Sequence, residues 1–213
     1  MSDIGAGLIA VKWELRTSGF SALDIEALAE IHRREVSGGF LSSLPLSALK
    51  LIYAEITENR NCVVVAAFPS VGAKPVGYIA GTLNCAALYR DFLKRKGLKA
   101  FCVFLPALLS VPRIRKAFET LLYPTRDGAT DFPAAELLNF AVQPPYWGTG
   151  LAQDLFLELI RQFRARGADR VRIVTGEGQT RARRFYEKMG ARRMGQTSVH
   201  AGQNDQVLVF AIR

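Results

Sequence analysis

The chain has 213 residues, of which 49% are hydrophobic and 22% are charged. This length predicts a single domain, and a chain of this size buries a core large enough to fold without a disulfide or a metal. The composition excludes a disordered chain, a collagen and a coiled coil. Lys and Arg number 28 and Asp and Glu 19, so the net charge is +9, which requires either an anionic partner or a solvated basic surface.

The positive charge lies in the last two thirds of the chain. Residues 1–83 carry seven basic and eight acidic residues, whereas residues 84–135 and 136–213 each carry five more basic than acidic residues. The basic residues are interspersed in segments with regular apolar patterns, while a nucleic-acid-binding tail is usually a dense basic block. The pattern therefore makes a basic nucleic-acid-binding domain the weakest interpretation of the charge, and we expect no nucleic-acid partner.

The cysteines and the apolar segments indicate the cellular environment. The three cysteines contain no C-x-x-C pair, and the two histidines lie far apart in the sequence, so we expect neither a metal site nor a secreted disulfide scaffold. The first ten residues lack the basic and apolar regions of a signal peptide. The longest apolar run, 100–111, contains Pro106 and is shorter than the ~18 residues of a membrane span. These features predict a cytoplasmic protein.

The first third of the chain predicts a strand, two helices and a hairpin, in that order. Alternating apolar and polar residues over 11–15 indicate the strand. Ser21 and Asp24 form a capping box that begins the first helix, and Pro45 suits the first turn of the second. The hairpin strands are predicted over residues 62–68 and 76–83.

Residues 84–134 interrupt this pattern and are predicted to be a helical insertion. Basic helical stretches over 89–99 and 112–122 flank an apolar run that ends at Val111. The insertion has three interpretations: additional core packed on the sheet, a lid over an acceptor, or a peripheral contact with an anionic membrane. We favour additional core over the membrane contact.

Strands and helices alternate again after Pro133. The pattern predicts strands over 135–142, 171–175 and 207–212 and helices over 150–166 and 180–189. The complete order of elements predicts one α/β domain, residues 1–213, with a mixed sheet.

A strand, a glycine-containing turn and a helix follow one another between Asn139 and Phe156. Pro144 and Pro145 end the strand, and Gly148 and Gly150 precede the helix. Glycines let backbone N–H groups approach a ligand, and the unpaired N–H groups and dipole of a helix N-terminus favour an anion. Taken alone, the turn fits an anion site and a simple tight turn about equally well.

Two segments together resemble the GNAT superfamily of N-acetyltransferases. The family's acetyl-coenzyme A motif has Val-x-Pro and then Arg/Gln-x-x-Gly-x-Gly/Ala, and this chain reads VQP over 142–144 and WGTGLA over 147–152. RFYEKMG over 184–190 is similar to the family's A-x-x-F-Y-x-x-x-G-F. The resemblance implies a GNAT-type mixed, mostly antiparallel sheet flanked by helices. Residues 135–190 would form its acetyl-coenzyme A-binding core, with 84–134 as an elaboration.

The resemblance implies acetyl-coenzyme A as the acyl donor and a set of residues that bind it. These residues are Phe140, Ala141, Val142, Trp147, Gly148, Thr149, Gly150, Leu151, Ala152, Gln179 and Arg181. The chain departs from the family pattern at three positions, where Trp147 replaces Arg or Gln, Gln179 replaces a frequent Asn, and Ala191 replaces Phe. The arginines at 181, 183 and 184 give part of the positive charge a role, because one or two of them are expected to contact phosphate.

Two residues are the candidates for catalysis. Glu136 lies in the strand that leads to the cofactor motif, and apolar neighbours would raise its pKa toward that of a useful base acting through water. A second interpretation is that Glu136 binds the cationic acceptor. Tyr186 matches the tyrosine that protonates the departing thiolate in many family members, and a backbone N–H near 140–142 is expected to bind the oxyanion.

The implied activity is transfer of an acetyl group to a primary amine. We expect a small-molecule or amino-sugar acceptor rather than a protein, and a monomer or homodimer. A looser resemblance to acyltransferases of surface-polysaccharide pathways suits the amino sugar. The alternative is a non-catalytic acyl-coenzyme A-binding regulatory module with the same fold, which the replacements at Trp147 and Gln179 motivate.

Overall fold

The computed structural model describes residues 13–36, 41–108, 132–176, 178–197 and 205–212. Its first elements are β1 (Glu14–Arg16), α1 (Ala22–Glu35), the 3-10 helix η1 (Leu41–Ser43), α2 (Leu46–Glu58), β2 (Cys62–Phe68), β3 (Gly77–Thr82) and α3 (Cys85–Leu108). These are followed by β4 (Glu136–Val142), the 3-10 helix η2 (Pro144–Tyr146), α5 (Leu151–Ala165), β5 (Arg170–Thr175), α6 (Thr180–Met189), β6 (Arg192–Thr197) and β7 (Asp205–Ala211). The predicted elements are present, except that the second basic stretch, 112–122, lies outside the described residues.

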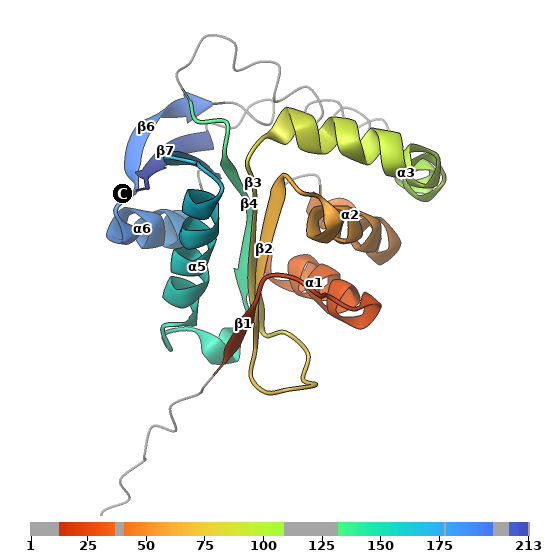
Figure 1. Ribbon diagram of the computed structural model, residues 1–213, viewed down its shortest axis with the longest axis horizontal. Coiled ribbons are helices and arrows are strands. Elements are labelled where there is room, and N and C mark those ends of the chain that lie inside the picture. Colours follow the sequence, from red (N-terminus) through yellow and green to blue (C-terminus); the bar gives the residue numbers. More distant parts are fainter. Residues whose placement is uncertain (1–12, 37–40, 109–131, 177, 198–204, 213) are drawn as a thin grey trace, which may run out of the picture.

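The strands form one seven-stranded sheet in the order β1-β2-β3-β4-β5-β7-β6 (Figure 1). Strands β4 and β5 are parallel, and the other neighbouring pairs are antiparallel. This arrangement confirms the predicted mixed, mostly antiparallel sheet. A parallel pair needs a crossover connection, and α5 provides it between β4 and β5.

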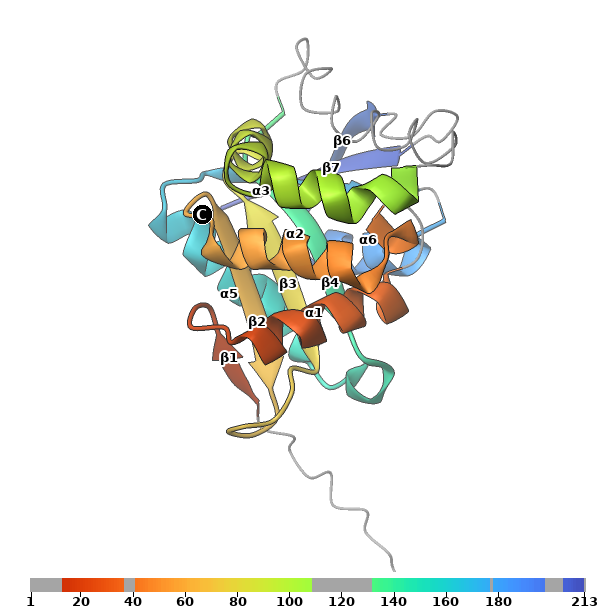
Figure 2. The same cartoon turned by 90° about the vertical axis from the view of Figure 1, so that its right-hand side faces the viewer.

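Helices cover both faces of the sheet, with α1, α2 and α3 on one side and α5 and α6 on the other (Figures 1 and 2). Strand β2 is buried along its whole length because it packs against both layers. Its even-numbered residues join the core under α1 and α2, and its odd-numbered residues join the core under α5. A strand that is buried on both faces has an unbroken apolar sequence, as CVVVAAF does.

Helix α1 begins at the predicted capping box. The Ser21 hydroxyl accepts a hydrogen bond from the Asp24 N–H at 3.1 Å, and the Asp24 carboxylate accepts one from the Ser21 N–H at 2.9 Å. This reciprocal pair satisfies two N–H groups that the helix start leaves without partners. Local side-chain chemistry therefore fixes where α1 begins.

The described part of the insertion packs against α2. Helix α3 runs without a break from Cys85 to Leu108, past Pro106, so the first basic stretch and the described part of the apolar run form one helix rather than separate pieces. Two ion pairs join the helices: Arg95 Nη1 lies 3.6 Å from Glu55 Oε1, and Lys96 Nζ lies 3.2 Å from Glu58 Oε2. Leu88 and Val103 of α3 also pack into the core under α1 and α2, as expected if this part of the insertion is additional core. Nowhere in the described ranges does a helix have the length and apolar character needed to cross a membrane.

Strand β6 was missing from the sequence prediction. It is an edge strand that pairs with β7 alone, and Arg192, Arg193 and Met194 are exposed on it. An edge strand exposed in this way has no alternation of apolar and polar residues, and charged side chains at an edge oppose pairing with other chains. The periodicity of the sequence therefore gives no signal for β6.

Gly81 occupies a point where β3, β4 and α5 approach closely. A Cβ at this position would lie 2.6 Å from Phe163 Cζ and 2.9 Å from the carbonyl oxygen of Glu136. Both neighbours are buried, so neither can move aside at low cost.

We predict that Gly81→Ala lowers the free energy of unfolding by about 1–3 kcal/mol, because the added methyl overpacks this contact. Gly97→Ala is the matched control: its Cβ meets nothing within 4 Å in the middle of α3, so it should stabilise by about 0.5–1 kcal/mol. Urea denaturation measures both variants. Equal unfolding midpoints for Gly81→Ala and the wild type would contradict the contact.

His32 lies in a buried polar cluster between α1, α2 and β3. Its Nδ1 is 2.8 Å from the Tyr53 hydroxyl and 3.2 Å from the Tyr78 hydroxyl, and the two hydroxyls are 2.5 Å apart. The histidine is fully buried, and burial lowers its pKa from 6.5 to about 4.

This pKa predicts a loss of stability on acidification. Below pH 6.5 the unfolded chain takes up a proton on His32 that the folded chain does not take up until about pH 4. The free energy of unfolding should therefore fall by about 3 kcal/mol as the pH drops across that window. Urea denaturation at pH 7 and pH 4.5 tests this against His32→Gln, which should lose less stability. Equal losses in the two proteins would exclude His32 as the cause.

Candidate active site

Strands β4 and β5 separate shortly after they begin to pair. Their register covers only Glu136 with Arg172 and Leu137 with Ile173. Beyond Leu137, strand β4 continues to pair with β3 as far as Val142. One edge of β4 therefore faces an opening between the two parallel strands.

A β-bulge sets which backbone groups face this opening. Leu137 pairs with Gly81 and Asn139 with Ala80, so Leu138 is an additional residue in β4. After the bulge, the N–H of Gln143 donates to the carbonyl of Val76, just before β3, at 3.0 Å. Because backbone groups alternate along a strand, the N–H groups of Val142 and Phe140 point to the other edge, into the opening.

The loop after β4 forms an open, glycine-containing cradle at the start of α5. Gly148 has a φ of 77° and Gly150 a φ of 94°, in the left-handed region that favours glycine. A Cβ on either residue would meet nothing within 4 Å, so space is open beside the loop. Gly150 caps α5 without a side-chain hydrogen bond, and the N–H groups and dipole of the first turn can bind a phosphate.

Three other residues predicted to bind the cofactor shape the loop after β4 or the turn after β5. The Thr149 hydroxyl donates to the carbonyl of Tyr146 at 2.7 Å and closes the turn. The Leu151 side chain is fully buried in the core, so only its backbone can contact a ligand. Gln179 stabilises the turn after β5, where its Oε1 accepts a hydrogen bond from the Gly176 N–H at 3.3 Å.

Trp147 and Arg181 meet at the same end of the opening. The Arg181 guanidinium carbon lies 3.9 Å from the centroid of the Trp147 ring, in a cation–π arrangement. The ring N–H of Trp147 donates to the carbonyl of Val142 at 2.7 Å. The structure thus brings a cation from α6 to the loop that follows β4.

Tyr186 lies in an aromatic cluster on the α6 side of β4. Its ring centroid is 5.5 Å from that of Phe185, 6.0 Å from Phe156 and 6.4 Å from Phe140. Burial raises the pKa of Tyr186 well above its usual value of 10. The phenol therefore stays protonated at neutral pH, as a proton donor must.

Glu136 lies at the first residue of β4 and is buried. Its Oε2 is 2.5 Å from an Arg172 nitrogen and accepts a hydrogen bond from the Cys85 thiol at 3.3 Å. The expectation of apolar neighbours for Glu136 is therefore wrong, because a buried arginine lies beside it. Arg172 comes from β5, and only the sheet pairing brings it to Glu136.

The predicted residues are distributed along the length of β4. Glu136 and Val142 are separated by about 20 Å, at the usual rise of a strand. Phe140, which contacts Tyr186, lies between them, about 13 Å from Glu136. The site is thus elongated, with the cradle at one end, Tyr186 along its length and the Glu136–Arg172 pair at the other end.

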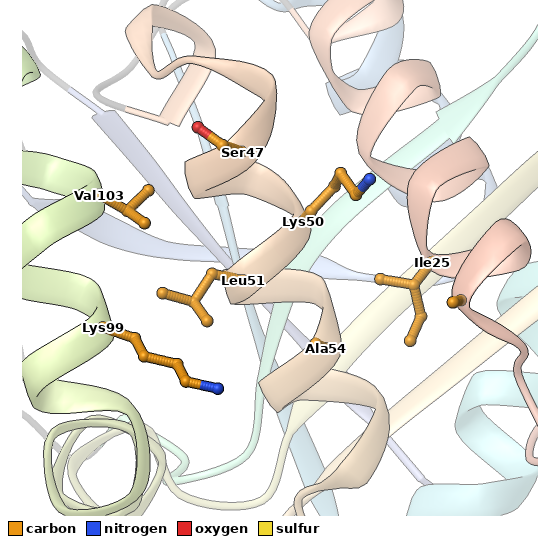
Figure 3. Close-up of a pocket in the computed structure, with 8 residues that line it drawn as sticks. Ile25, Ser47, Lys50, Leu51, Ala54, Lys99 and Val103 are labelled. Atoms are coloured by element: carbon orange, nitrogen blue, oxygen red, sulfur yellow. The ribbon is translucent and has the colours of Figure 1, made fainter.

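A separate groove lies over the outer face of α2, between α1 and α3 (Figure 3). Its volume is about 650 Å³, and Ile25, Leu51 and Val103 give it an apolar lining with Lys50 and Lys99 beside them. None of the residues predicted for catalysis or cofactor binding lines this groove.

A model described as the Acetyltransferase (GNAT) family matches residues 25–191, more than half of the chain. The chain belongs to the GNAT family. This finding confirms the resemblance inferred from the two sequence motifs, and the matched region includes the β4–β5 opening, the cradle and Tyr186.

Solved structures of GNAT proteins share the fold. The PaiA N-acetyltransferase of Thermoplasma acidophilum, in complex with coenzyme A, superposes with a TM-score of 0.58 at 14% identity, over 94% of this chain and 99% of that one. Arabidopsis thaliana NAA60, in complex with acetyl-CoA, superposes with a TM-score of 0.57 at 14% identity, over 94% of this chain and 99% of that one. These matches confirm the predicted GNAT-type fold.

A curated relative matches a shorter stretch. Mycothiol acetyltransferase of Thermobispora bispora is 37% identical over 71 residues, which are 33% of this chain. The match spans about a quarter of that protein's length, 24%.

Three contacts of the site were missed by the sequence analysis. Arg172 and Cys85 contact Glu136, and Trp147 stacks on Arg181. An arginine within the apolar strand VRIVT was an available signal, since a charge in a buried strand requires a partner. No local pattern indicates Cys85 or the stacking, because both depend on segments distant in sequence.

We predict that Arg172→Met lowers the free energy of unfolding by about 3–5 kcal/mol, because it leaves the Glu136 carboxylate buried without its cation. The double variant Glu136→Leu/Arg172→Met should regain most of this loss, since it removes both charges. Urea denaturation of the two variants checks the result. A double variant as unstable as Arg172→Met would show that the pair itself is not the cause.

Proposed function

We propose that this protein is an N-acetyltransferase that moves the acetyl group of acetyl-coenzyme A to a primary amine of a small-molecule acceptor. The observation that carries the proposal is the β4–β5 opening, which leads from the Glu136 end of β4 to a glycine cradle at the start of α5. Membership of the GNAT family supports the same activity, because the family uses acetyl-coenzyme A as its donor.

The opening suits a long donor with a phosphate at one end. The pyrophosphate binds the N–H groups of Gly148 to Ala152, where open space adjoins both glycines. The extended arm of the donor lies along the free edge of β4, and the thioester reaches the region of Phe140 and Tyr186. Ala141 supports this arrangement from the other face of β4, where its side chain joins the core under α1 and α2.

The acceptor amine must lose a proton before it attacks. An amine with a pKa of ~10.4 is neutral in only about one molecule in a thousand at pH 7. In the proposed mechanism a chain of several water molecules carries this proton to Glu136, because the carboxylate lies about 13 Å along the strand from Phe140. In the alternative role Glu136 attracts the ammonium group; in both roles the carboxylate needs its position beside Arg172.

The remaining steps transfer the acyl group. The amine nitrogen forms a bond to the thioester carbon, and the N–H groups of Phe140 and Val142 stabilise the oxyanion that develops. The C–S bond then breaks, and the Tyr186 phenol donates its proton to the departing thiolate. The nitrogen gives up its second proton, which restores the Tyr186 phenol and leaves a neutral amide. The proton held by Glu136 returns to water, so the products are the amide and free coenzyme A.

The second candidate is an acyl-coenzyme A-binding regulatory module without catalysis. The orientation of Gln179 favours it, because its side chain is used in the turn at Gly176. A thiol-release assay over a panel of amines separates the two candidates. Among these amines we favour small molecules, including amino sugars, over protein termini.

We predict that Glu136→Gln and Tyr186→Phe each lower kcat by about 100-fold or more, with the dissociation constant for acetyl-coenzyme A within a factor of 3 of the wild type. Glu136→Asp keeps the negative charge beside Arg172 and serves as a control for folding, together with circular dichroism of each variant. Full activity in both Glu136→Gln and Tyr186→Phe would show that the assigned roles are wrong.

A further inference from the structure

The glycine cradle contains no positively charged side chain of its own. Residues 143–152 read QPPYWGTGLA and include neither Lys nor Arg. Backbone N–H groups can bind a pyrophosphate, but its two charges are bound more tightly when a cation also contributes. The stacking of Arg181 on Trp147 brings a cation to this loop.

Trp147 is held by two hydrogen bonds although the residue is 48% exposed. Its ring N–H donates to the Val142 carbonyl at 2.7 Å, and its main-chain N–H donates to the Pro144 carbonyl at 3.0 Å. The first bond attaches the indole, and the second attaches the backbone of Trp147, to the segment that joins β4 to the cradle. The ring therefore presents a fixed flat surface directly before Gly148.

Arg181 approaches this surface from the other side of the opening. It lies in the first turn of α6, which follows β5, and its guanidinium covers the indole at 3.9 Å. A guanidinium that stacks through its face keeps its N–H groups in its own plane, directed away from the ring. Those donors match the geometry of phosphate oxygens and can form two parallel bonds.

We propose that Trp147 is a positioning residue that holds the Arg181 guanidinium beside the cradle, where Arg181 binds the pyrophosphate of the donor. This inference rests on the proposed function, because it requires a coenzyme A thioester as the ligand. Trp147 acts on the phosphate through Arg181, and the two residues form one functional unit. Their contribution to affinity is therefore not additive.

A double-mutant cycle tests this coupling. Calorimetry of coenzyme A binding to the full chain compares the wild type with Trp147→Ala, Arg181→Ala and the double variant. Each single variant should raise the dissociation constant on the order of 10-fold, as expected for loss of a charge-assisted contact. The double variant should stay within about 2-fold of Arg181→Ala, because Trp147 has nothing left to position.

Three further measurements distinguish the positioning of Arg181 by Trp147 from a change in the conformation of the loop or in the net charge. Trp147→Phe keeps an aromatic face and should bind within about 3-fold of the wild type. Lys188→Ala removes one charge from the last turn of the same helix and should bind within about 2-fold. Acetyl-pantetheine lacks the pyrophosphate, so its dissociation constant should be equal in all variants.

Additive losses in the cycle, an unchanged Trp147→Ala variant, or weaker acetyl-pantetheine binding in Trp147→Ala would each overturn the inference. Tighter binding by Trp147→Ala would also overturn it, because the stack would then be a barrier that the donor displaces. A wild-type chain that binds no coenzyme A at millimolar concentration would overturn the proposed function itself.

Discussion

The separation of β4 from β5 is the constraint on which the rest of the site depends. The two strands pair at Glu136 and Leu137, and the bulge at Leu138 then changes which N–H groups face β5. A buried polar backbone requires partners, so an edge left open in the middle of a sheet is costly unless a ligand or water satisfies it. The crossover through α5 makes the pair parallel and places the helix start beside the end of β4.

The two helical layers keep this opening in place. Phe156 of α5 and Phe185 and Tyr186 of α6 pack around Phe140 on one face of β4. On the other face, the core under α1 and α2 includes Ala141. Strand β4 is therefore held on both faces by packing rather than by β5, and the same packing places the Tyr186 ring beside Phe140.

The parts of the site that could be predicted from sequence are those encoded locally. The glycine turn, the helix that follows it and the Phe-Tyr segment of α6 are signalled by residues within a few positions of one another. The Glu136–Arg172 pair and the Trp147–Arg181 stack join residues 36 and 34 positions apart, respectively, so they depend on sheet pairing and on where α6 begins. Strand β6 was missed for a related reason, since an exposed edge strand has no apolar alternation.

The net charge of +9 now has a partial structural explanation. In α3, Arg95 and Lys96 pair with acidic residues of α2, so part of the charge of the insertion serves packing. Arg172 neutralises Glu136 within the core, and Arg181 lies beside the cradle. Positive charge in this protein is thus used in ion pairs between elements and, in the proposed function, on the phosphates of the donor.

Amide NMR of the ¹⁵N-labelled chain during titration with acetyl-coenzyme A tests the central claim most directly, because it reports on each backbone N–H that is proposed to bind the donor. The account predicts the largest shifts at the amides of Phe140, Val142 and Gly148 to Ala152, with little change in the groove over α2. Shifts confined to that groove, or no shifts at millimolar donor, would contradict it.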